Sequence, residues 1–232
     1  MTLQPLGERI KGKLALLQPT LSVASRQVLE YPDQASFYPW YIATMHGISR
    51  AAVPLMQAAV RAVEARPDDE VSNPLRDYLM KHIPEELGHD EWALEDLEVI
   101  GVDRETVLGH IPSPSLAALV GAQYYWIEHV HPVAIMGYLA VMESNAPSPD
   151  AVRHLMNATR FPQAAFRSME IHSRLDVRHS ADVYEMLDGL ETTDRHARLV
   201  AISAMSTTEA LIQVITDLVS HAANQPELRA GC

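Results

Sequence analysis

Apolar residues recur at helical spacing along most of the chain, and Pro, Gly, Asp and Asn separate the recurring stretches. In the second stretch, for example, Ile42, Met45, Ala52 and Met56 follow one another at intervals of three, seven and four residues, which places them on one helix face. The sequence contains no Asn-Gly hairpin, no sustained alternation of apolar and polar residues and no internal repeat. Seven helices are expected, over about residues 6–29, 36–65, 73–101, 113–144, 150–158, 161–189 and 193–223.

This pattern predicts an all-α fold with a single domain over residues 1–232 and a short flexible tail from about residue 224. The composition agrees, because apolar residues make up 47% of the chain and aromatic residues only 6%, which favours helices over a β-sandwich. Pro84 lies inside the third stretch. A proline removes a helical hydrogen bond, so a bend is expected just before Glu85 and Glu86.

The charge and the termini narrow the class of protein. A formal net charge of −12 argues against nucleic acid or an anionic membrane as a partner, since both attract basic surfaces. The N-terminus lacks the charged-then-apolar order of a signal peptide, and we expect no apolar run long enough to span a bilayer. Cys232 is the only cysteine, so no intrachain disulfide is expected and a cytoplasmic location is the default.

Two short clusters combine histidine with carboxylates. One is Glu86-x-x-His89 and the other is His172-x-x-x-Asp176-x-x-His179. Because each helical residue advances by about 100°, the members of each cluster fall within an arc of roughly 60°. Imidazole and carboxylate donors without a thiolate suit iron, manganese or zinc. Such spacing is also common on solvated helix faces, but two such stripes in one predicted bundle favour a metal site.

Two metals need a further carboxylate from another helix. The fourth stretch offers Glu128 and Glu143. We favour Glu143, because it follows an apolar run and because a helix dipole disfavours an unpartnered acid at that end. His82 and Glu85 lie on or near the same stripe as Glu86, and both remain alternative ligands.

With these motifs the chain resembles the heme-oxygenase-like diiron oxidases and oxygenases, which share a seven-helix fold with heme oxygenase, TenA and PqqC. The resemblance implies two Fe²⁺ ions held by Glu86, His89, Glu143, His172, Asp176 and His179. Some members carry a Glu seven residues before the first His, and this chain has His82 there. Its Glu-x-x-His motif is similar to that of the fatty-acid decarboxylase branch.

The resemblance further implies an enzyme that uses dioxygen to hydroxylate, desaturate or cleave an amino acid or a fatty acid. An electron donor is a candidate partner. We favour an amino-acid substrate, because Glu209, His46 and Thr208 are polar residues on helix faces predicted to point inward. Tyr124 is a further candidate for the pocket. The consecutive Tyr124, Tyr125 and Trp126 are expected to straddle the core and an interface, as in a homodimer.

Four other interpretations of the function remain open. The first is a diiron fatty-acid oxidase or decarboxylase, and the second is a metal-free enzyme similar to TenA or PqqC. A thiaminase mechanism needs an internal nucleophilic cysteine, for which Cys232 at the chain end is poorly placed. The third is a heme oxygenase with one proximal histidine, which leaves the Asp176 cluster without a purpose. The fourth is a non-catalytic metal store or a binding protein that kept the fold.

Overall fold

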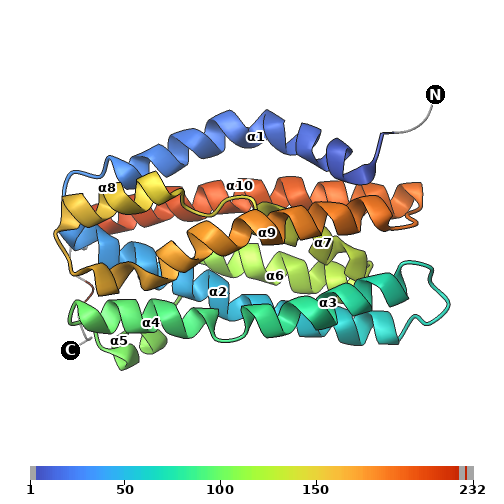
Figure 1. Ribbon diagram of the computed structural model, residues 1–232, viewed down its shortest axis with the longest axis horizontal. Helices are drawn as coiled ribbons and strands as arrows, with labels where there is room; N and C mark the ends of the chain where they lie inside the picture. The colour runs from blue at the N-terminus through green and yellow to red at the C-terminus, as the bar shows by residue number, and fades with distance from the viewer. Residues whose placement is uncertain (1–3, 225–227, 229–232) are drawn as a thin grey trace.

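The computed structural model describes residues 4–224 and Leu228, which form an elongated bundle of helices (Figure 1). Its elements are α1 (Leu6–Leu29), α2 (Gln34–Glu64), α3 (Ser72–Glu86), α4 (His89–Val99), α5 (Arg104–Gly109), α6 (Pro114–His129), η1 (Pro132–Ala134), α7 (Ile135–Met142), α8 (Pro149–Thr159), η2 (Gln163–Phe166), α9 (Arg167–Gly189) and α10 (Asp194–Asn224). No strand occurs in these described residues. The all-α prediction is confirmed. The predicted tail after residue 224 lies outside the described residues, apart from Leu228.

The prediction of seven helices is wrong, because two expected helices are each divided and the six-residue α5 is added. The third expected helix divides into α3 and α4 at Leu87, which is extended, and Gly88, whose φ is 87°. Glycine adopts this left-handed conformation without steric cost. The interruption therefore comes after Glu86 and not just before Glu85, and Pro84 stays inside α3.

The fourth expected helix divides between α6 and η1. Pro132 begins η1, and the residue before it, His131, has the extended backbone that a following proline favours. The chain then turns through η1 into α7. Every residue from Ile135 to Val141 is buried, so α7 is a core helix that is apolar on all sides. Glu143 follows directly as its C-terminal cap residue, and its side chain is only 8% exposed.

The close packing of α7 on α10 depends on Gly137. A methyl group at this position would lie 2.4 Å from the carbonyl oxygen of Val200 and 2.7 Å from the backbone nitrogen of Ala204. Both atoms belong to the backbone of α10, which cannot move aside as a side chain could. Gly137 thus sets how closely α7, and with it Glu143, approaches the centre of the bundle.

The long helix α10 crosses the whole bundle and packs against α1, α6 and α7 (Figure 1). By length and composition alone it could cross a membrane, and it is the one such helix among the residues described. The expectation that the chain contains no such segment is therefore wrong. However, 56% of its most apolar window is buried inside the bundle, and the core helix of a soluble protein meets the same criterion.

We predict that Gly137→Ala lowers the free energy of unfolding by about 1–3 kcal/mol or more, because overpacking against rigid backbone cannot relax. Urea denaturation followed by circular dichroism measures this change. Gly121→Ala is the matched control, since a methyl group there meets no atom within 4 Å and alanine favours a helix. Equal stability of the two variants would contradict the role of Gly137.

Candidate metal centre

Five of the six expected ligand residues come together in the bundle, and the sixth, Asp176, lines the cavity beside them. Glu86 and His89 flank the turn between α3 and α4, and Glu143 caps α7. The cluster of His172, Asp176 and His179 lies on α9. Glu86 is at the centre of the arrangement. Its Oε1 lies 3.3 Å from Nδ1 of His179, and its Oε2 lies 3.1 Å from Nδ1 of His89. The two oxygens of one carboxylate therefore face two different imidazoles.

Two groups of potential ligand atoms share Glu86. In each group the atoms lie within 4.8 Å of one another, and the groups are His82, Glu86, Glu143 and His179, and Glu86, His89 and His172. The second group joins residues of α3, α4 and α9, although the helix between Glu86 and His89 is interrupted. Adjacent groups with a common carboxylate are the arrangement that a two-metal site requires.

The hydrogen bonding of the imidazoles fits metal ligation. Nδ1 of His89 and Nδ1 of His179 are buried, and each lies near an oxygen of Glu86 without forming a hydrogen bond of ordinary geometry, which is costly for a polar atom unless a ligand satisfies it. The Nδ1 of His172 donates to the carbonyl oxygen of Ser168 at 2.7 Å. Its Nε2 is then left with a lone pair, and burial lowers the pKa of this imidazole. The donor set therefore fits a metal ion.

The carboxylates of the cluster differ in charge. Burial acts to raise the pKa of Glu86, but its contacts with His179 and His89 hold it well below its ordinary value. Asp176 belongs to neither ligand group, although it lines the adjoining cavity. Burial and the neighbouring charges of Glu143 and Glu86 raise the pKa of Asp176 to about 8. Without metal, this acid is therefore mostly neutral at pH 7.

A cavity of about 160 Å³ adjoins the cluster. Apart from the metal-binding candidates its lining is mostly apolar, and none of its lining residues is Lys or Arg. Met45, Met56, Met142 and Met169 contribute flexible side chains to its walls. The arrangement offers a polar end, formed by the cluster, and an apolar body.

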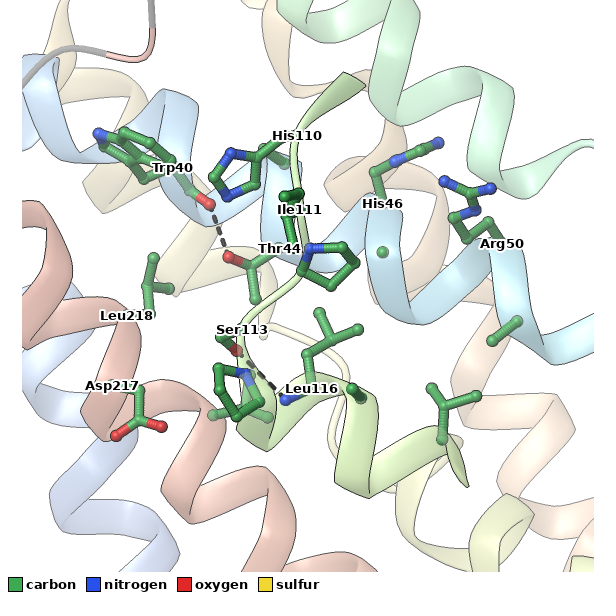
Figure 2. A pocket seen from close by; sticks show the side chains of 18 of the residues that line it. Trp40, Thr44, His46, Arg50, His110, Ile111, Ser113, Leu116, Asp217 and Leu218 are labelled. Carbon is green, nitrogen blue, oxygen red and sulfur yellow. Dashed lines mark hydrogen bonds between the residues drawn. The ribbon is translucent and has the colours of Figure 1, made fainter. Parts of the chain in front are cut away.

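The residues proposed as a substrate pocket lie elsewhere. His46 and Tyr124 line a second cavity of about 1120 Å³ between α2, α6 and α10. Figure 2 shows this cavity, with Trp40, Thr44 and His46 of α2 beside the segment that carries His110. Glu209 is exposed. None of the three lines the cavity beside the cluster. Thr208 lines a third cavity and donates its hydroxyl to the carbonyl oxygen of Ala204, so the polar residues that suggested an amino-acid substrate do not line the cavity beside the candidate metals.

Sequence reasoning missed Asp96, which fixes α9 relative to α4. This residue is 1% exposed. It accepts hydrogen bonds from the backbone nitrogens of Arg167 and Ser168 at 3.1 and 2.9 Å, and also from the Ser168 hydroxyl. A carboxylate at a helix N-terminus satisfies otherwise unpaired N–H groups. It holds the helix that carries His172 against the one that begins with His89. Sequence spacing gives no signal for this contact.

A separate cluster of Asp69, His131 and His196 also has metal-like composition. The Nδ1 of His131 accepts a hydrogen bond from the backbone nitrogen of Val133 at 3.1 Å, so its proton lies on Nε2. Nε2 donates to Asp69 at 2.8 Å. A metal at Nε2 would have to displace this proton and leave an imidazolate. We therefore interpret the cluster as a structural contact between the α2–α3 loop, the start of η1 and α10.

Comparison with known proteins identifies the family. Residues 31–217 match a family described as iron-containing redox enzymes. The chain belongs to this family. No curated protein matches the sequence. The expected resemblance to heme-oxygenase-like proteins is confirmed.

The solved structures that share the fold include the following three. One is a domain of unknown function with a heme oxygenase-like fold from Shewanella denitrificans OS217, with a TM-score of 0.80, 18% identity and 100% of both chains covered. A CADD-like protein of unknown function from Nostoc punctiforme PCC 73102 has a TM-score of 0.71 and 17% identity, covering 93% of this chain and 98% of the other. A TenA homologue from Pseudomonas syringae pv. tomato DC3000 has a TM-score of 0.65 and 12% identity, covering 90% and 93%. At these identities the likeness shows the fold alone.

We predict that metal binding to this cluster strengthens as the pH rises. The contacts of His179 with Glu143 and Glu86 raise its pKa to about 10, and that of Asp176 is raised to about 8. Near pH 7 both groups hold a proton that ligation must remove, so binding should release close to two protons from this pair. Calorimetric titration with Fe²⁺ in buffers of different ionisation enthalpy, between about pH 6 and pH 8, measures this release. An affinity that does not vary with pH would contradict ligation by these residues.

Proposed function

We propose that this protein is a dioxygen-dependent nonheme diiron oxidase or oxygenase. The observation that carries the proposal is the position of Glu86, whose two oxygens face imidazoles of two different ligand groups. A carboxylate so placed can bridge two metal ions. Membership in a family of iron-containing redox enzymes supports iron as the metal.

Two Fe²⁺ ions would supply the electrons with which dioxygen is activated for attack on a nearby C–H or N–H bond. The residues of this chain hold the ions and set the charge of the site. Against a charge of +4, the carboxylates of Glu86, Glu143 and Asp176 bring −3, which leaves about +1. A substrate that presents an anionic group to this end of the cavity is therefore favoured.

The volume and polarity of the apolar cavity limit which group the rest of the substrate can be. Its volume of about 160 Å³ is close to that of an engineered apolar cavity of about 150 Å³ that binds benzene. Its walls favour an aliphatic group over a charged one. We therefore propose a compact aliphatic carboxylic acid, held with its carboxylate towards the ligand cluster. Hydroxylation, desaturation and carbon–carbon cleavage are all compatible with this orientation.

An aliphatic amino acid is the second candidate. The side chain of Asn145 also lines the cavity, and its Nδ2 donates to the carbonyl oxygen of Val141 at 2.7 Å. The amide oxygen of Asn145 is an acceptor for the ammonium group of such a substrate. This single acceptor favours an amino acid as the substrate, whereas the apolar walls favour the simple carboxylic acid.

We predict that Asp176→Ala lowers the iron content from two ions to about one per chain and reduces oxygen-dependent turnover at least about 100-fold, because one metal loses a carboxylate ligand. Iron quantitation and an oxygen electrode measure both effects. The control is Asp182→Ala on the same helix, since Asp182 instead pairs with Lys81 at 3.5 Å. Turnover by Asp176→Ala at the parental rate would show the diiron assignment to be wrong.

A matched pair of substrates separates the two candidate classes. Leucine and 4-methylpentanoate share the carboxylate and the branched side chain and differ in the ammonium group. We expect the iron-loaded protein to consume dioxygen faster with 4-methylpentanoate, because the cavity walls provide few partners for an ammonium ion. Faster consumption with leucine would instead favour the amino-acid class.

A further inference from the structure

His82 lies between two carboxylates in the interior of the bundle. Its side chain is 2% exposed. Its Nε2 lies 3.3 Å from Oε1 of Glu143, and its Nδ1 lies 3.4 Å from Oε2 of Glu85. Its ring also meets that of His179 edge to face, with centroids 4.8 Å apart. One nitrogen of His82 thus faces the ligand group and the other faces away from it.

His179 also lies between Glu85 and the ligand group, but its Nδ1 and Nε2 have the opposite positions to those of His82. Its Nδ1 faces Glu86 at 3.3 Å and Glu143 at 3.4 Å. Its Nε2 lies 3.7 Å from Oε2 of Glu85. The same oxygen of Glu85 is therefore near the outward nitrogens of both imidazoles, while the inward nitrogens face the shared ligand group.

Metal-ligating histidines almost always donate their second ring N–H to a carboxylate, a carbonyl oxygen or water, which fixes the tautomer and the ring orientation. We propose that His82 is a further ligand of the candidate metal centre and that Glu85 is a positioning residue for both His82 and His179. This inference rests on the proposed function, because it concerns the same metal centre.

The surroundings of Glu85 agree with a role outside the ligand set. Its side chain is 26% exposed, and its Oε1 lies 3.3 Å from Nη2 of Arg178, which is itself 59% exposed. The same Nη2 lies 3.2 Å from Nε2 of His179. A guanidinium cannot accept a hydrogen bond, so this second contact gives way when Nδ1 binds metal and Nε2 carries the proton. An exposed arginine can move aside and leave Glu85 as the acceptor.

With His82 included, the two metals have matching ligand sets. One set contains His82, His179 and Glu143, the other contains His89, His172 and Asp176, and Glu86 is shared between them. His82 then binds through Nε2 and His179 through Nδ1. These opposite tautomers are a specific consequence of the geometry around Glu85.

The first test uses the unaltered protein with Zn²⁺, a diamagnetic probe. Long-range ¹H–¹⁵N correlation spectra of the ¹⁵N-histidine-labelled protein show which ring nitrogens carry protons and which bind metal. We expect His82 to carry its proton on Nδ1 and His179 on Nε2. A His82 ring with neither nitrogen bound to metal would overturn its assignment as a ligand. Failure of Zn²⁺ to bind at all would instead contradict the metal centre and, with it, the proposed function.

The second test titrates variants with Co²⁺, whose absorption spectrum reports its ligands. The parent should bind two equivalents, and His82→Ala should weaken one of them by at least about 100-fold. Glu85→Ala should weaken the same equivalent about 10–100-fold without removing it. Glu85→Gln should have a smaller effect, because its amide oxygen still accepts one N–H. The control is Glu91→Ala, which removes an exposed carboxylate paired with Arg104 and should change nothing.

Three outcomes of the titration would overturn the inference. Two equally tight equivalents in His82→Ala would exclude His82 as a ligand. Parental affinity in Glu85→Ala would exclude positioning by Glu85, and complete loss of one equivalent in that variant would make Glu85 a direct ligand. Each of these results leaves the parent's two metals, and therefore the proposed function, in place.

Discussion

Carboxylates buried together in an apolar core are the constraint on which the structure of this site depends. Glu86 and Glu143 keep lowered pKa values because imidazoles contact them. The charge of His179 lowers the pKa of Asp176 too little to offset burial and the neighbouring carboxylates, so this pKa rises to about 8. Burying like charges without compensation costs far more than one ordinary contact provides. Protons on His179 and Asp176 supply that compensation in the metal-free protein, and divalent cations can replace those protons.

Several separate features of the fold bring these groups together. The turn at Gly88 directs Glu86 and His89 towards a common point from two helices. The burial of α7 on all sides carries Glu143 into the interior, and Gly137 allows the close approach to α10 that this requires. Asp96 then fixes α9 against α4. Ligands supported by rigid and mutually packed elements keep their geometry better than ligands on loops.

The same fold also contains a second, larger cavity (Figure 2). The residues of α2 that line it differ from those that line the cavity beside the cluster. The histidines and the tryptophan of the larger cavity are not shared with the cavity beside the cluster. A helix as long as α2, with 31 residues, presents different faces to two cavities. Candidate ligand residues line only the smaller of these two cavities, and a fold alone does not determine a function.

The sequence by itself determined the helical class, most helix ends and the stripe of His172, Asp176 and His179, since these depend on local periodicity along one uninterrupted helix. It also singled out Glu143 as an acid in an apolar setting. Only the tertiary structure decided that Glu86 and His89 meet across a break, and that Glu85 lies beside both His82 and His179. It likewise decided that His46 faces the other cavity and that Glu209 faces solvent. Periodicity tells which residues share a helix face, but which neighbour covers that face depends on packing between segments far apart in the chain.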